Sequence, residues 1–138
     1  MTDWDNFKTQ DEPDQAAFLV RTAREALPAL CAFPDVHSKT AASLSVAGDV
    51  LTGDYSAFAD VVRFLDDPDM QDDYNVYAGV VDGDAAAQAA LDLASYACGF
   101  TARISAPAAG VSHLPDPVLE AMPYVADYFR IQAAVLGL

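Results

Sequence analysis

Residues 84–104, DAAAQAALDLASYACGFTARI, limit the fold of this chain more than any other segment. Alanine and leucine are among the strongest helix formers, and Gly83-Asp84 supplies a break followed by a capping residue. The sequence therefore predicts one long helix here. Its small residues would let a neighbouring helix approach closely, and they recur along the segment as Ala86, Ala87, Ala90, Ala94 and Ala97.

A second helix is predicted to begin near DEPDQAAF. Asp11 or Asp14 can cap it, and Pro13 suits a first turn. Pro28 lacks an N–H group, so we expect the helix to kink or restart there. The apolar side chains recur at spacings of three and four, as Ala16, Val20, Ala23, Leu27 and Leu30.

Two further helices follow before the acidic centre of the chain. Asp35 or Ser38 is expected to open the first, and Gly53 to end it. Asp54 or Ser56 is expected to cap the second. Their predicted buried stripes are Leu44, Ala47 and Leu51 for the first, and Tyr55, Phe58, Val62 and Leu65 for the second.

The C-terminal part contains one more helical pattern. Asp116 and Pro117 make a helix start, and Pro123 predicts a bend or a late start. The stripe consists of Val118, Met122, Val125, Phe129, Ala133 and Leu136. No alternating strand pattern of useful length occurs. We therefore expect an all-α fold, a compact bundle of about five helices, with residues 1–138 as one domain and residues 1–12 as a loose N-terminal segment.

The net charge of −14 comes from 21 acidic and 7 basic residues. Binding to nucleic acid or to an anionic membrane needs a basic face, so neither partner is expected. The charge favours basic partners or cations, or it serves only the solubility of the protein. The acidic, polar N-terminus is unlike a secretory signal, and no apolar run approaches the roughly 20 residues of a membrane span. We expect a soluble, cytoplasmic protein.

The charge is concentrated between Asp66 and Asp84, where seven aspartates occur without a base. An EF-hand calcium loop that starts at Asp67 does not fit. Asp72 is at the sixth position, where the loop needs a glycine, and Ala78 is at the twelfth, where it needs a glutamate. The stretch is either a solvated connection between helices or a docking face for a basic partner, and the docking face is our hypothesis. Its predicted contact residues are Asp66, Asp67, Asp69, Asp72, Asp73, Tyr74 and Tyr77.

Catalytic signatures do not occur in this sequence. There is no GxSxG elbow, P-loop or GxGxxG motif. Cys31 and Cys98 stand in apolar stretches, where buried free thiols behave as small hydrophobes. His37 and His113 have no ligand spacing and are expected in exposed loops or caps. We predict no metal, no cofactor and no enzymatic activity.

Two segments together carry a family resemblance. LSVAGDVLTGDYSAFADVVRFL is followed by the alanine-rich AAAQAALDLASYACGFTA, with Leu51, Gly53 and Asp54 forming a "leucine, x, Gly, acid" turn. This half of the chain resembles the helical immunity proteins of bacterial polymorphic toxin systems. The resemblance implies a bacterial protein that binds and neutralises a basic cognate toxin without catalysis.

Two alternatives remain open from the sequence. One is a small ligand-binding or enzymatic bundle with a pocket between the alanine-rich helix and the C-terminal helix, where Tyr96, Tyr124 and His113 could form the walls. The other is a homodimer that buries the alanine-rich face.

Overall fold

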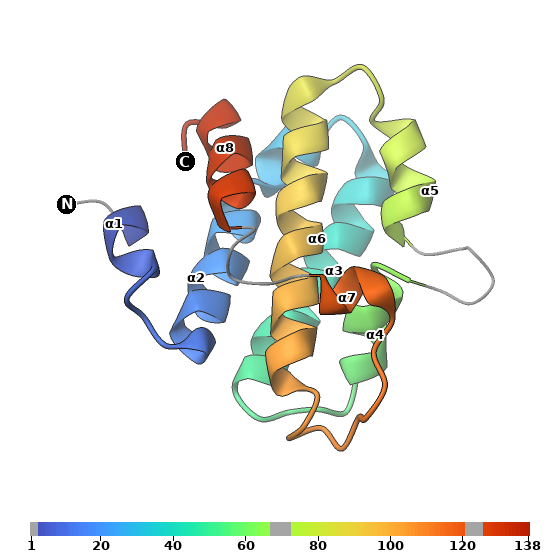
Figure 1. Cartoon of the computed structure of the whole chain (residues 1–138). Helices are drawn as coiled ribbons and strands as arrows, with labels where there is room; N and C mark the ends of the chain where they lie inside the picture. Colours follow the sequence, from blue (N-terminus) through green and yellow to red (C-terminus); the bar gives the residue numbers. More distant parts are fainter. Residues whose placement is uncertain (1–2, 67–72, 121–125) are drawn as a thin grey trace.

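The computed structural model describes residues 3–66, 73–120 and 126–138. These ranges contain α-helices and one 3₁₀ helix, η1, and no strand, so the predicted all-α fold is confirmed, with more short helices than the expected five (Figure 1). The elements are α1 (Asp3–Phe7), α2 (Glu12–Glu25), η1 (Leu27–Leu30), α3 (Pro34–Leu51), α4 (Phe58–Arg63), α5 (Asp73–Val80), α6 (Ala85–Ser105), α7 (Asp116–Leu119) and α8 (Ala126–Val135). None of these helices combines the length and apolar character that a membrane crossing requires.

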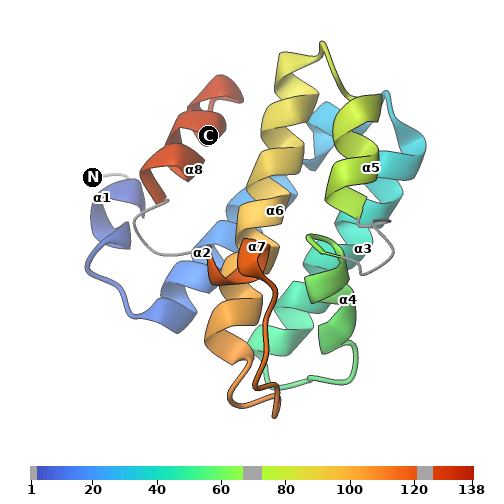
Figure 2. The ribbon, with the colours of Figure 1, turned by 45° about the vertical axis from the view of Figure 1, so that its right-hand side comes forward.

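Helix α6 is the centre of the bundle. It packs against α2, α3, α4, α5, α7 and α8. Figures 1 and 2 both place α8 and α5 on opposite sides of its N-terminal half. Leu91, Leu93 and Phe100 supply its bulk, and all three are buried. The remaining elements are thus arranged around the one long helix that the sequence predicts.

The alanines of α6 are covered by helices of the same chain. Ala87, Ala90, Ala94 and Ala97 are each at most 2% exposed. Their short side chains bring neighbouring backbones close, which is the role that the sequence suggests for them. This alanine face is therefore occupied within one chain, and a homodimer would have to use a different surface.

The sequence-predicted caps of α2 and α6 have the expected geometry. The Asp11 carboxylate accepts a hydrogen bond from the backbone N–H of Asp14 at 3.0 Å, and Asp84 does the same for the N–H of Ala87 at 3.0 Å. Each bond satisfies a helix-start donor that has no partner inside the helix. The predicted interruption at Pro28 is also observed, because α2 ends at Glu25 and the chain continues as η1.

The predicted caps of α3 and α4 were wrong. Asp35 and Ser38 lie inside α3, which begins with Pro34, a residue whose fixed φ suits a first turn. Asp54 caps a turn instead: its carboxylate accepts from the N–H of Ser56 at 3.1 Å and from the Ser56 hydroxyl at 2.7 Å. These bonds lower the pKa of Asp54. Gly53 adopts φ +98°, the left-handed conformation expected of a residue that ends a helix.

Helix α4 buries a different face from the predicted one. Phe58, Val61 and Phe64 are at most 5% exposed, whereas Val62 and Leu65 are half-buried. The pairs Val61-Val62 and Phe64-Leu65 each offer two adjacent apolar side chains, so the sequence pattern fits two faces one residue apart. Packing against α3 and α6 selects the face with Phe64.

The N-terminal segment is packed against the bundle rather than loose as expected. Phe7 is 2% exposed, and the ring of Trp4 lies 4.7 Å from that of Phe18 and 5.5 Å from that of Phe129, between centroids. The indole N–H of Trp4 also donates to the backbone oxygen of Leu138 at 3.4 Å. These large rings bury apolar area that an unattached segment would leave in water, which explains why α1 is docked.

Two threonine hydroxyls are enclosed in the core. Thr40 of α3 is 1% exposed and Thr101 of α6 is fully buried. Neither hydroxyl has a hydrogen-bond partner among the described residues. A buried hydroxyl without a partner opposes folding because it has lost its hydrogen bonds to water.

Candidate binding cleft and acidic surface

The predicted contact residues are only partly within the described structure. Asp66 is half-buried just after α4, and its N–H donates to the Val62 oxygen at 3.0 Å. Asp73 and Tyr74 begin α5, whereas Asp67, Asp69 and Asp72 lie outside the described residues. Tyr77 is half-buried and packs against the hydrophobic core, so only part of its ring faces solvent.

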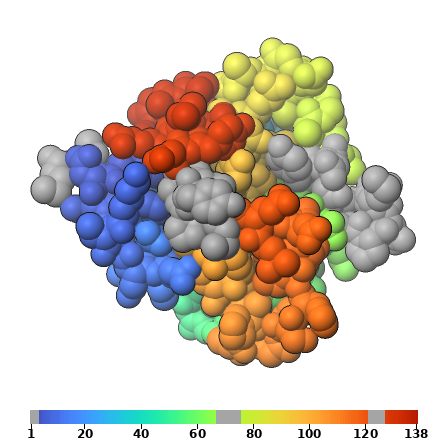
Figure 3. All heavy atoms as spheres, viewed as in Figure 1, coloured from blue at the N-terminus to red at the C-terminus, as the bar shows by residue number. Residues whose placement is uncertain are grey.

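A cleft of about 360 Å³ lies between α5, α6 and α8. This volume is within the range of about 300–1,000 Å³ that is typical of ligand pockets. Figure 3 shows part of the surface of α6 between α8 and α5. The cleft is lined by Ala78, Val81, Ala85, Gln88, Leu91, Asp92, Tyr128, Gln132 and Val135.

The walls of the cleft divide into an apolar and a polar part. Val81 and Leu91 are buried beneath it and make an apolar floor. Gln88, Asp92 and Gln132 supply polar groups. The side-chain N–H of Gln88 donates to the Asp82 carboxylate at 3.3 Å, which turns its amide toward the start of α6. The cleft thus combines amide and carboxylate side chains with an apolar base.

A tyrosine pair borders the cleft. The rings of Tyr96 and Tyr128 meet edge to face, with centroids 5.4 Å apart and an angle of 69° between planes. Burial raises the pKa of both phenols, and the negative charge of Asp92 raises each further. Asp92 therefore acts on both rings. At neutral pH the two phenols are uncharged and can present ring faces or O–H groups to a ligand.

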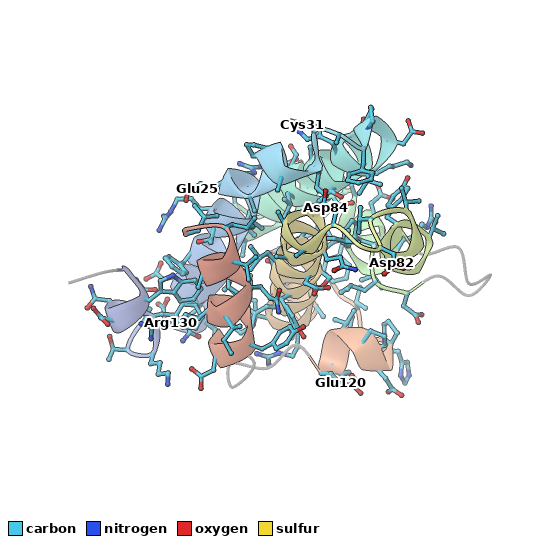
Figure 4. All side chains as sticks on the ribbon, turned by 90° about the horizontal axis from the view of Figure 1, so that it is seen from above. Glu25, Cys31, Asp82, Asp84, Glu120 and Arg130 are labelled. Carbon is cyan, nitrogen blue, oxygen red and sulfur yellow. The ribbon has the colours of Figure 1, made fainter. Side chains whose placement is uncertain are left out.

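The electrostatic surroundings of the cleft are negative. Residues 64–102, which include α5 and most of α6, contain no Lys, Arg or His. Figure 4 looks down α6 from its N-terminal end, with Asp84 at its start and Asp82 beside α5. Arg130 of α8 lies two residues from both Tyr128 and Gln132, which puts it on the opposite side of the helix. Figure 4 shows Arg130 on the side of α8 away from α6.

Exposed apolar side chains gather on the two helices that flank the cleft. Among the described residues, six large hydrophobic side chains are exposed, and five of them belong to α5 or α8. They are Val76 and Val80 of α5, and Tyr128, Ile131 and Val135 of α8. Tyr128 and Val135 line the cleft, whereas Val76 and Val80 are each two residues from Ala78, which puts them on the side of α5 away from the cleft. Exposed apolar side chains on neighbouring helices are typical of binding surfaces.

The cleft lies where the sequence places a pocket in the ligand-binding alternative, between the alanine-rich and C-terminal helices. Tyr96 is not among the residues that line it, although its ring contacts that of Tyr128, which does. His113 is exposed in the loop before α7 and does not line the cleft, and Tyr124 is outside the described residues. Sequence reasoning missed Gln88 and Asp92. A signal existed, because Gln88, Asp92 and Tyr96 recur every four residues on one face of α6.

A smaller cavity of about 190 Å³ lies between α3 and α4. It is lined by Lys39, Asp60 and Arg63, together with Ala42, Ser43 and Val46. Two cations and one carboxylate give it the opposite charge balance to the cleft, so it does not match a basic ligand.

The cysteine and histidine expectations had mixed outcomes. Cys98 is buried as predicted, whereas Cys31 is exposed because it ends η1 at a turn before Pro34. His113 is exposed, but His37 is half-buried inside α3 rather than in a loop. Within residues 3–66, 73–120 and 126–138, no three His, Cys, Asp or Glu side chains come together as a metal site would require.

Comparisons with protein-family models, with curated protein sequences and with solved structures each found no match for this chain.

Proposed function

We propose that this chain is a non-enzymatic binding protein that neutralises a basic protein partner, in the manner of an immunity protein acting on its toxin. The surface formed by α5, the N-terminal half of α6 and the acidic stretch before α5 is its contact face. Binding there would cover positive charge that the partner needs for its own activity, so no chemistry by this chain is required.

One observation carries the proposal: the coincidence of base-free sequence with exposed apolar side chains. Residues 64–102 contain eight aspartates and no base. The described residues of this range that line the cleft are Ala78, Val81, Ala85, Gln88, Leu91 and Asp92. Val76 and Val80 are exposed on α5 within this region. Acidic charge accelerates the encounter with a basic protein, and apolar side chains then contribute contact area. A solvated connection between helices would need the charge but not the exposed valines.

Binding kinetics test the contact face. The partner to use is a basic toxin-type domain, taken from any secreted protein that a neighbouring gene encodes, and the measurement is surface plasmon resonance at several salt concentrations. A triple variant, Asp66→Asn, Asp69→Asn and Asp73→Asn, should slow association by roughly tenfold at low salt, because steering depends on charge near the interface. The difference should shrink as salt rises.

A matched control separates local charge from net charge. The control variant also removes three negative charges, but from exposed positions on α3 and after α7, by Asp35→Asn, Asp49→Asn and Glu120→Gln. This variant should associate almost as fast as the unmodified chain. Equal slowing by both variants would contradict the assigned face, and no binding by the unmodified chain would contradict the function itself.

A second candidate function is the binding of a small ligand in the cleft. Its volume and its mixture of an apolar floor with Gln88, Asp92 and Gln132 favour this candidate. Calorimetry with neutral and cationic metabolite mixtures distinguishes the two. Saturable binding of a small molecule that leaves association with the basic protein unchanged would support the second candidate.

A further inference from the structure

The side of the cleft formed by Asp92 and Tyr128 has the chemistry of a receptor for a cationic group. Among the nine described residues that line the cleft, Asp92 is the one that carries a charge at neutral pH. The aromatic ring of Tyr128 lines the same cleft from α8 and is supported by its contact with Tyr96. A carboxylate beside an aromatic ring attracts a cation through both the charge and the ring quadrupole.

The remaining walls match the rest of a long basic side chain. Val81 and Leu91 form the floor, and Ala78, Ala85 and Val135 continue the apolar lining. Arginine and lysine carry their charge at the end of an apolar stem, which gains by covering such a surface. The carbonyl oxygens of Gln88 and Gln132 add acceptors that suit the several donors of a guanidinium group.

From this arrangement we infer that the cleft between α5, α6 and α8 receives one arginine side chain of the basic protein partner, with Asp92 as its charge partner and Tyr128 as its stacking surface. This inference rests on the proposed function for the source of the arginine. The occupant is a side chain of the partner because Ile131 and Val135, which are exposed on α8, extend the apolar surface beyond the cleft, where a protein would make further contacts. A free small molecule would leave them uncovered.

The cleft itself is tested by NMR titration of the full isotopically labelled chain. The probe is N-acetylarginine methylamide, and N-acetylcitrulline methylamide is its uncharged isostere. Saturable shift changes should be confined to the cleft, at Gln88, Asp92 and Gln132. Binding of the citrulline compound should be weaker by roughly tenfold or more, because it lacks the charge that Asp92 attracts.

Two variants and one control locate the binding. Asp92→Asn should weaken the arginine probe by roughly tenfold or more, while Asp49→Asn, which removes an equal charge from α3, should have little effect. Val135→Trp places a large side chain at a position that is already 54% exposed, so it should block the cleft without disturbing the core. Dispersed shifts that are the same in all three variants would overturn the inference.

Three further results concern the source of the arginine. Agmatine, a free cation with the same guanidinium group, should bind no more tightly than the peptide-like probe, and binding tighter by tenfold or more would overturn the assignment to a partner side chain. If the basic protein binds the Asp92→Asn and unmodified chains equally, the cleft inference fails and the proposed function stands. If the basic protein does not bind at all, the proposed function fails, although the probe still reports on the cleft.

Discussion

The two sides of helix α8 meet very different surroundings. On one side Phe129 is 1% exposed and joins Trp4 in an aromatic cluster that holds α1 and α2. On the other side Tyr128 is 44% exposed and lines the cleft beside α6. One helix thus provides stability with one face and leaves apolar surface uncovered with the other. Stability and binding should therefore be separable by substitutions only one or two residues apart.

The largest expected effect comes from removing the buried aromatic ring of α8. Phe129→Ala should lower the free energy of unfolding by about 3–5 kcal/mol, because it removes a buried ring and leaves a cavity beside Trp4. Chemical denaturation measures this loss. Ile131→Ala on the same helix, at a position 61% exposed, should change the unfolding free energy by no more than about 0.5 kcal/mol. Equal losses from both variants would contradict the distinction between the two faces.

A smaller effect concerns the helix that forms the cleft floor. Asp84→Ala removes the carboxylate that accepts from the N–H of Ala87 and should cost about 1 kcal/mol of stability. Asp11→Ala removes the equivalent cap of α2 at a similar cost. Only the Asp84 variant should shift the amide signals of Gln88 and Leu91. If the Asp11 variant shifts these signals equally, the Asp84 cap has no specific effect on the residues that line the cleft.

The smallest effect is on tyrosine ionisation at the edge of the cleft. The pKa values of Tyr96 and Tyr128 are raised above the ordinary 10.0, so the folded state disfavours the charged form. Their contribution to stability is complete below pH 10.0 and is lost as the pH rises through the raised pKa values. Asp92→Asn should lower both pKa values partway, since burial remains, and should reduce this alkaline loss. Tyrosinate absorbance, compared with Tyr96→Phe and Tyr128→Phe variants, measures the change. Unaltered titrations would show that Asp92 does not act on the pair.

The sequence predicts a helix well where its pattern allows only one interpretation. Alanine spacing and the Asp84 cap predict α6, and Asp11 with Pro13 predicts the start of α2. The α4 face was missed because two adjacent apolar residues occupy each turn, and only contacts with α3 and α6 choose between them. Cys31 was misplaced for a related reason. An apolar stretch does not reveal which of its residues meets the turn.

The cleft shows a different limit of sequence reasoning. The pattern locates a pocket between α6 and the C-terminal helix, but Asp92 stands within an alanine-rich segment where a single acid reads as a solvated helix position. Its importance depends on Tyr128, which is 36 residues later in the chain and reaches it only after folding. The acidic stretch before α5 is recognisable in the sequence because its aspartates are close together. The single carboxylate of Asp92 has no such pattern around it.

The buried hydroxyls of Thr40 and Thr101 bear on how such variants can be studied. Valine has nearly the same shape as threonine but no group that needs a partner, so Thr40→Val and Thr101→Val should each stabilise the fold from within α3 and α6. Neither position is among the residues that line the cleft. A doubly substituted chain would tolerate damaging changes on α8 that unfold the natural sequence. Binding could then be measured for α8 variants in this stabilised chain.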